Sequence, residues 1–150
     1  MRTRYFATLK TILTSAVLML LLASCQKEAD APVNCPQTMA GIAGTYKPTG
    51  LTYRSSASAP EQDYFALMDA CEKDDKVILD INGTYDYQDT GLACSPDGSN
   101  SGTWSVSGNT ITSDGITNGT IQSFDCRKLV VVTNDIIVPG DKLTLTMERQ

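Results

Sequence analysis

The chain contains no histidine among its 150 residues. Histidine is the commonest general base and the commonest metal-ligating side chain in proteins. Its absence excludes Ser-His-Asp and Cys-His catalytic sites. An enzyme built from this sequence would need two carboxylates with shifted pKa values converging in one cleft. We therefore predict a protein without enzymatic activity.

The cysteines also lack the close spacing that metal sites require. None of the five forms a Cys-x-x-Cys pair, which argues against a zinc site made of cysteines. Two segments rich in oxygen side chains, 72–75 and 97–102, resemble parts of calcium sites. The second has Gly108 where a calcium loop places its bidentate glutamate. We interpret both as solvated turns and predict no metal ion and no cofactor.

Basic residues are in the minority, with 12 against 17 acidic residues and a formal charge of −5. Three of the basic residues, Arg2, Arg4 and Lys10, precede the first apolar stretch. Without them the charge is −8, from 9 basic and 17 acidic residues. Binding to nucleic acid depends on neutralising phosphates with lysine and arginine, so this balance predicts no nucleic-acid partner.

Long apolar runs are absent apart from one near the N-terminus. Residues 11–22 carry no charge and follow the basic residues, but they are shorter than the roughly 20 residues that span a bilayer. The next residues, Leu22-Ala23-Ser24-Cys25, resemble a lipobox. The sequence thus predicts a lipoprotein signal peptide over 1–24 and a diacylglyceryl thioether on Cys25. Two or three acyl chains anchor a protein stably to a membrane.

Residues 25–40 are polar, contain two prolines and lack periodicity, which predicts a flexible tether. Its acidic start, Gln26 to Asp30, resembles the signal that exports some Bacteroidetes lipoproteins to the outer face of the outer membrane. A plain solvated linker explains the same residues equally well. We predict a lipid-anchored protein of the bacterial outer membrane and leave the face open.

Setting Cys25 aside leaves an even number of cysteines: Cys35, Cys71, Cys94 and Cys126. Export implies an oxidising compartment, so two disulfides are expected. Four cysteines allow three connectivities. We favour Cys71–Cys94, which would tie the two ends of a hairpin, with Cys35–Cys126 holding the N-terminal segment.

From residue 41 onward the chain is dominated by short strands and turns. Apolar residues alternate within the strands, as in the last of them, where Leu143, Leu145 and Met147 share one face. Asn82-Gly83 is a pair typical of type I′ hairpin turns. Regular short strands with local turns predict one all-β domain, an antiparallel sandwich or barrel. The expected strands are 45–53, 76–81, 84–88, 102–106, 110–113, 120–126, 128–133 and 141–148.

One segment has helical spacing instead. Ser58 and Glu61 fit a capping box with Pro60 in the first turn, and Tyr64, Leu67, Met68 and Cys71 recur on one face. We predict a short helix over 59–70, packed as a lid on the sheet.

Several of these segments together resemble one family. The run from Cys71 to Tyr85, Gly91-Leu-Ala-Cys94, Ser101-Gly-Thr-Trp-Ser-Val106 and Asn109-Thr-Ile-Thr112 are similar to the lipocalin-like domain of Bacteroidetes lipoproteins. The early Gly-x-Trp element of that family is Gly44-Thr-Tyr46 here, with tyrosine in place of tryptophan. The resemblance implies an up-and-down eight-stranded lipocalin-like barrel over residues 41–150. It implies no catalytic residues.

Such a barrel encloses either packed side chains or one small ligand. Trp104, Tyr85 and Tyr87 are the candidate residues for lining a ligand cavity, and the alternative is that they fill the core. We predict a binding module for a small apolar or glycan ligand. The alternative function is an accessory subunit that binds a protein partner of the cell envelope.

Overall fold

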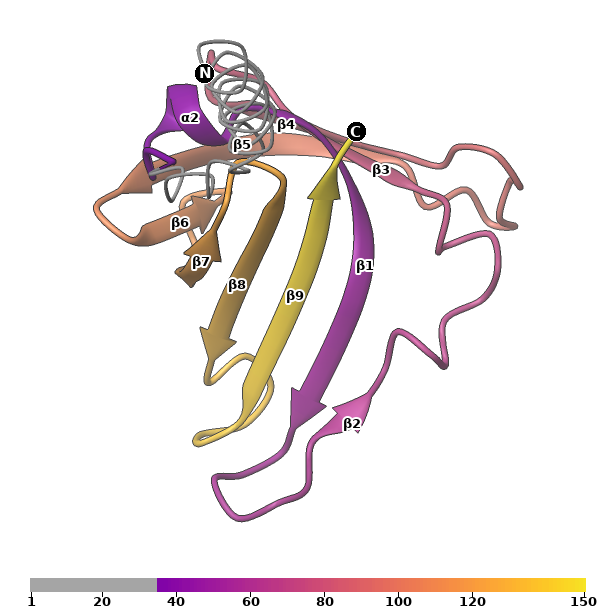
Figure 1. Cartoon of the computed structure of the whole chain (residues 1–150). Helices are drawn as coiled ribbons and strands as arrows, with labels where there is room; N and C mark the ends of the chain where they lie inside the picture. Colours follow the sequence, from indigo (N-terminus) through magenta and orange to yellow (C-terminus); the bar gives the residue numbers. More distant parts are fainter. Residues whose placement is uncertain (1–34) are drawn as a thin grey trace, which may run out of the picture. The chain divides into compact units, whose positions relative to one another are not determined.

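The computed structural model describes residues 35–150, which form an all-β domain (Figure 1). Residues 1–34, with the predicted signal peptide, Cys25 and most of the predicted tether, lie outside the described residues. The elements are α2 (Met39–Ile42), β1 (Gly44–Arg54), β2 (Gln62–Asp63), β3 (Lys76–Leu79), β4 (Thr84–Gln88), β5 (Asn100–Ser107), β6 (Thr110–Ser113), β7 (Thr117–Phe124), β8 (Lys128–Asn134) and β9 (Lys142–Arg149).

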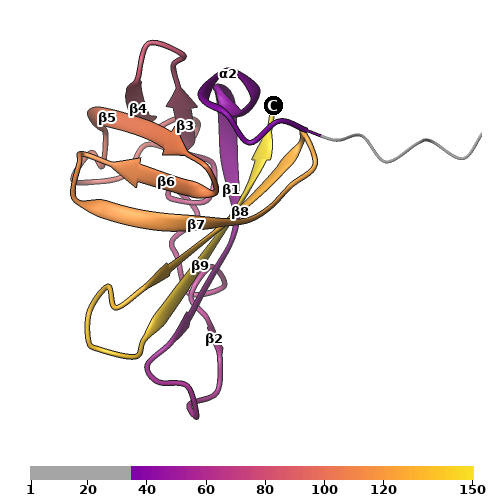
Figure 2. The same ribbon diagram turned by 90° about the vertical axis from the view of Figure 1, so that its left-hand side faces the viewer.

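The strands form a closed antiparallel barrel with up-and-down order. Each strand from β3 to β9 pairs with the next, β1 pairs with β3, and β1 also pairs with β9 to close the sheet. β2 has only two residues and pairs with the end of β1 alone, so eight strands make the barrel wall. The predicted eight-stranded up-and-down barrel is confirmed. Figure 2 shows β5, β6 and β7 running across the direction of β8 and β9, as in a strongly coiled barrel.

The first strand is irregular where it contains a proline and a glycine. The register of β1 against β9 shifts between Pro48 and Gly50, which identifies a bulge. A bulge accommodates a proline inside a sheet, because the ladder hydrogen bond that proline cannot donate is skipped there. β1 pairs with β3 at its start, through Gly44 to Tyr46, and with β9 from Tyr46 to Arg54.

One end of the barrel is closed by the short helix α2 and by large side chains. Ile42, Tyr46 and Leu129 are fully buried there. We call this the closed end. The rest of the core cluster is Cys35, Leu79, Trp104, Ile121, Phe124 and Met147.

The other end is formed by four connections, because alternate turns of an up-and-down barrel lie at the same end. These segments are 55–75, 89–99, 114–116 and 135–141. We call them the mouth loops. Three of them, 55–75, 89–99 and 135–141, are longer than the turns of the closed end, and the first contains β2.

The predicted helix over 59–70 is wrong, and the one α-helix among residues 35–150 lies at Met39–Ile42 instead. The segment forms turns, and Leu67, expected in the core, is 75% exposed. Side chains take up the backbone donors that a helix would use. The Asp63 carboxylate accepts from the Ala66 N–H and Glu72 accepts from the Asp69 N–H. Bonds of this kind compete with helix formation.

The turn at Asn82-Gly83 also differs from the expected type I′ geometry. Only Gly83 has a positive φ, of 92°. The turn begins at Asp80, whose carbonyl accepts from the Gly83 N–H, while the Asp80 N–H donates to Thr84 O. A left-handed glycine after such a turn is the usual three-residue hairpin connection. The hairpin of β3 and β4 is therefore present with a longer turn.

Residues 35–40, predicted as the end of the tether, belong to the domain. Cys35 is buried and bonded to Cys126, and Met39 begins α2. The second disulfide joins Cys71 and Cys94, so both favoured pairs are present. Within residues 35–150, no helix has the length and apolar character needed to cross a membrane.

Candidate functional site

A cavity of about 250 Å³ lies against the inner wall formed by β3, β4, β5 and β6. The strand register places most of its lining on one face of the sheet: Val77 is opposite Tyr87, and Leu79 is opposite Tyr85. All three candidate ligand residues are in the lining. The lining residues are Val77, Leu79, Tyr85, Tyr87, Asn100, Trp104, Ile111, Thr112 and Ser113.

Trp104 forms the floor of this cavity. It is 4% exposed and belongs to the core cluster at the closed end. Its indole Nε1–H donates to the carbonyl of Asp80 at 2.8 Å, so its only polar atom is satisfied by the β3–β4 turn. The ring therefore gives the cavity an apolar surface. It is also packed in the core, which was the alternative to a role in lining the cavity.

Tyr87 stands at the mouth side of the cavity and is held by a buried carboxylate. Its hydroxyl donates to Asp75 Oδ2 at 2.7 Å, and Asp75 is only 2% exposed. Asp75 Oδ1 accepts from the Thr90 N–H at 3.2 Å, which ties two mouth loops together. Burial and the hydrogen bond to Asp75 raise the pKa of Tyr87 well above its usual value. Tyr87 is therefore a neutral donor with a fixed ring orientation.

Tyr85 is fixed in a similar way by Asp114 on the β6–β7 turn. Its hydroxyl donates to Asp114 Oδ2 at 2.8 Å, and the Thr103 N–H donates to Asp114 Oδ1 at 2.8 Å. The hydrogen bond to Asp114 raises the pKa of Tyr85, and the bonds from Thr103 and Tyr85 lower the pKa of Asp114. Gly102 makes room for this contact, because a Cβ there would lie 2.7 Å from Tyr85 Cε1.

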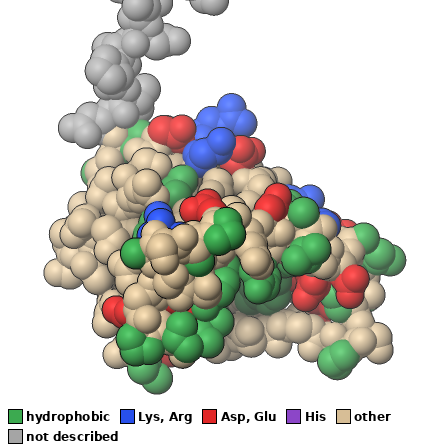
Figure 3. Space-filling view, turned by 90° about the horizontal axis from the view of Figure 1, so that it is seen from below, with side chains coloured by type: hydrophobic (Ala, Val, Ile, Leu, Met, Phe, Trp, Pro, Cys, Tyr) green, Lys and Arg blue, Asp and Glu red, His purple; other side chains and the backbone are tan. Residues whose placement is uncertain are grey.

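The opposite inner wall is apolar as well. Leu145 is paired with Leu51 of β1 on one side and with Val131 of β8 on the other. All three share the inward face but are only partly buried, unlike Met147 nearer the closed end. In the view from below, hydrophobic side chains gather within and around a hollow (Figure 3). The interior is packed at the closed end and hollow toward the mouth.

The acidic segments considered as calcium sites are used in loop folding. Asp74 Oδ2 accepts from the Leu92 N–H, and Asp97 Oδ1 accepts from the Ser99 N–H. Among residues 35–150, no three His, Cys, Asp or Glu side chains are grouped closely enough to hold a metal ion.

The candidate residues Trp104, Tyr85 and Tyr87 are thus brought together in one cavity. Sequence reasoning missed the carboxylates that orient the two tyrosines, Asp75 and Asp114. Asp75 was grouped with its acidic neighbours as a solvated turn. No local pattern distinguishes it, since its partner is 12 residues away and only the β3–β4 register brings the two together.

A comparison with protein families supports the architecture. A family model described as a lipocalin-like domain matches residues 42–146. No curated protein and no solved structure matched the chain. Lipocalin-like barrels are generally binding folds rather than enzymes.

Proposed function

Because the chain belongs to the lipocalin-like domain family, we propose that it is a binding module that takes a small apolar ligand into its barrel. The observation that carries this proposal is the cavity against β3–β6, with Trp104 as its floor and Tyr85 and Tyr87 on its wall. Ligand sites are concave, mostly apolar, and contain a few oriented polar groups. The two tyrosine rings, each held by a carboxylate, supply that orientation.

The size of the cavity limits the ligand. A volume of about 250 Å³ is below the roughly 300–1,000 Å³ of pockets for drug-sized molecules. The lining includes Val77, Leu79 and Ile111, and its polar groups lie toward the mouth, where Asn100 begins β5. This lining favours an apolar body over a glycan. Any polar end of the ligand would face the mouth.

The cavity is tested by filling it. Ser113 lies opposite Trp104 on the inward face, so Ser113→Phe places a ring in the cavity. We expect the wild-type chain to bind the neutral apolar dye N-phenyl-1-naphthylamine at one site, with a blue-shifted emission. Ser113→Phe should weaken this binding on the order of tenfold or more, since it removes most of the volume.

The matched control is Ser105→Phe, which adds the same ring on the exposed outer face of β5. It should leave dye affinity unchanged, and thermal melts should show both variants folded. If the wild type takes up no dye, or if both variants bind it equally, the cavity is not a ligand site.

We also propose that the domain is held at a bacterial outer membrane by lipids on Cys25. The support is the sequence alone: a basic start, an apolar stretch of signal-peptide length and the Leu22-to-Cys25 lipobox. Cys25→Ala should move the protein from the membrane fraction to the soluble fraction after cell lysis. Metabolic labelling with a palmitate analogue should disappear in the same variant. Retention of Cys25→Ala in the membrane fraction would refute the anchor.

A second function, accessory subunit of an envelope complex, is favoured by one observation: large hydrophobic side chains are exposed on the domain.

A further inference from the structure

The exposed hydrophobic side chains are concentrated at one end of the barrel. Eight large hydrophobic residues are exposed among those described, and seven of them lie on the mouth loops. Only Ile81 lies at the closed end. The seven are Tyr64, Leu67, Leu92, Ile116, Ile136, Ile137 and Val138. We call these the rim residues, and we propose that the rim is a docking surface for a basic amphipathic peptide.

The rim is built by the fold. Asp141 is buried and its carboxylate accepts from the N–H groups of Ile136, Ile137 and Val138 at 2.8–2.9 Å. Asp74 holds Leu92 in the same way, through its N–H at 2.9 Å. In both loops the carboxylate points inward to the backbone and the apolar side chains point out. In an ordinary solvated loop, the charged side chains face the solvent and the apolar side chains face the protein.

Covalent and polar links join two of the mouth loops to each other and a third to the barrel wall. The disulfide Cys71–Cys94 and the hydrogen bonds of Asp75 connect segment 55–75 to segment 89–99. Tyr53 on β1 donates to Asp141 Oδ2 at 3.1 Å and so connects segment 135–141 to the barrel wall. A partner would meet a surface that is already formed, which reduces the entropic cost of binding.

The charge of the mouth loops identifies the partner. They contain eleven acidic residues and one basic residue, Lys73. Three basic residues lie at the adjacent strand ends: Arg54, Lys76 and Lys142. Their neighbours along the strands face inward, so these three side chains are on the outer face of the barrel. The one ion pair among the described residues, Lys128–Glu148, is on strands β8 and β9 toward the closed end. The mouth is therefore apolar and negatively charged together.

Internal hydrogen bonds keep several of these carboxylates ionised. Burial raises the pKa of Asp141, but the N–H groups of Val138, Ile137 and Ile136 outweigh it and lower the pKa overall. Hydrogen bonds from Ser99 lower the pKa of Asp97. The negative potential persists at neutral pH, so a complementary partner must carry positive charge beside apolar side chains.

A basic amphipathic peptide fits these requirements better than other occupants. The acidic mouth repels nucleic acid and anionic membranes, whose surfaces carry the same sign of charge. The rim extends over four loops, which is more than the tail of one small amphiphile covers. Amphipathic helices present apolar anchors at i, i+3, i+4 and i+7 on one face, with charged side chains on the other. Cys35, the first described residue, is bonded to Cys126 at the closed end, at the opposite end from the rim.

The probe is a synthetic 18-residue peptide of leucine and lysine in helical amphipathic spacing, titrated by calorimetry into the disulfide-bonded domain. We expect one site with a Kd on the order of 1–10 μM at low salt, weakened about tenfold in 0.5 M NaCl because the charges are screened. A scrambled peptide of the same composition, and the same peptide with glutamate for lysine, should bind at least about tenfold more weakly.

Paired variants locate the site. Ile116 and Ile137 are 81% and 73% exposed, so Ile116→Ser with Ile137→Ser should leave the fold intact and weaken peptide binding about tenfold or more. Ile81→Ser, on a residue 63% exposed at the closed end, is the matched control and should have no effect. Glu61→Gln with Asp69→Asn removes two exposed mouth charges and should reduce the salt dependence. Glu148→Gln should not.

The proposal is overturned if the scrambled peptide binds as well as the amphipathic one. It is equally overturned if the rim variant Ile116→Ser with Ile137→Ser keeps wild-type affinity for the peptide. Ser113→Phe fills the cavity and spares the rim, so it should retain peptide binding. Failure of the cavity proposal is therefore distinguishable from failure of this one.

Discussion

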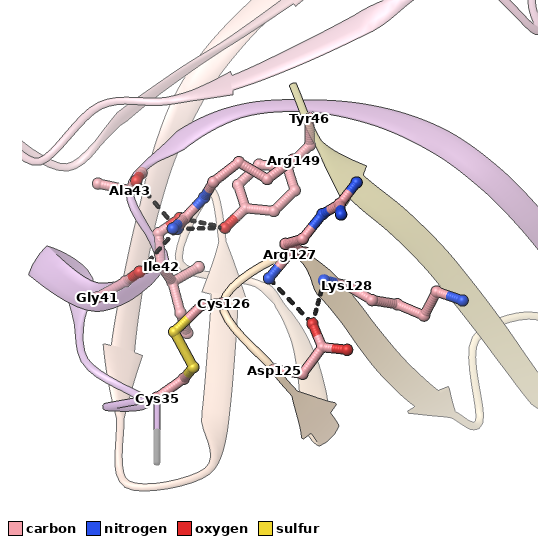
Figure 4. Close-up of a disulfide and its surroundings, with 10 residues drawn as sticks. All are labelled: Cys35, Gly41, Ile42, Ala43, Tyr46, Asp125, Cys126, Arg127, Lys128 and Arg149. Atoms are coloured by element: carbon pink, nitrogen blue, oxygen red, sulfur yellow. Dashed lines mark hydrogen bonds between the residues drawn. A yellow bond between two sulfur atoms is a disulfide. The ribbon is translucent and has the colours of Figure 1, made fainter. Parts of the chain in front are cut away.

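Removing the disulfide between Cys35 and Cys126 is expected to lower the free energy of unfolding by about 4–5 kcal/mol. The bond joins residues 91 apart in sequence, so it removes a large loop-closure entropy from the unfolded chain. It also fixes the segment that leads into α2 (Figure 4), and Cys35 is part of the buried core. The double variant Cys35→Ala, Cys126→Ala, unfolded in urea, measures the loss.

The other disulfide provides the comparison. Cys71–Cys94 spans 23 residues, and the same entropic argument gives about 3–4 kcal/mol for Cys71→Ala, Cys94→Ala. That bond joins two mouth loops and lies away from the closed end. Its loss should therefore alter the structure of the mouth loops more than that of the barrel strands. If the mouth disulfide proves the more stabilising of the two, the entropic account of Cys35–Cys126 is wrong.

The strands of the barrel were predictable because each hairpin carries its own local information. The alternation of Leu143, Leu145 and Met147 locates β9, and the turn residues Gly108 and Asn109 separate β5 from β6. Closure of the sheet came from the family resemblance. Strand spacing alone did not decide between a sandwich and a barrel. The deciding contact is the pairing of β1 with β9, which joins the two ends of the domain sequence.

The failed helix shows where local patterns mislead. Tyr64 and Leu67 have the spacing of a buried helical face, but the barrel already covers its own interior and leaves them no core to join. The apolar pattern there reflects a surface. Other residues determine the structure of this segment. The Asp63 and Glu72 carboxylates bond to neighbouring backbone N–H groups, and Cys71 is held by its disulfide.

The site was predictable in part. The aromatic residues Tyr85, Tyr87 and Trp104 were identified because strand alternation places them inward in the hairpins. Asp75 and Asp114, which orient the tyrosines, depend on contacts across 12 and 29 residues that no local pattern encodes. Arg149 was missed for the same reason, since its partners Gly41 and Tyr46 lie at the far end of the domain sequence.

Arg149→Ala is expected to lower the free energy of unfolding by about 3–5 kcal/mol, because truncation leaves buried partners unsatisfied. The guanidinium lies between the rings of Tyr46 and Phe124, 5.3 Å from each centroid. Its Nη2 donates at 2.7–3.3 Å to four oxygens, the carbonyls of Gly41, Ile42 and Ala43 and the hydroxyl of Tyr46 (Figure 4). No other side chain among the described residues joins α2 to β9 in this way.

The environment of Tyr46 shows how tightly the side chains are packed at the closed end. Burial raises the pKa of Tyr46, against the opposing effect of Arg149, and its hydroxyl donates to Ile42 O at 2.6 Å. With Arg149 removed, Tyr46 and the carbonyls of α2 lose their cation, and α2 loses its connection to the last strand. The thermal midpoint should fall by about 10–20 °C in a domain of this size.

Arg127→Ala is the matched control, because Arg127 is an exposed arginine at the same end whose side chain makes no hydrogen bond. Its loss should change stability by less than about 0.5 kcal/mol. Arg149→Lys keeps the charge but not the planar donor fork, so it should recover only part of the loss. Full recovery of stability with lysine would mean that the positive charge alone accounts for the stabilising effect of Arg149. Equal effects of Arg149→Ala and Arg127→Ala would show that the contacts of Arg149 do not stabilise the barrel.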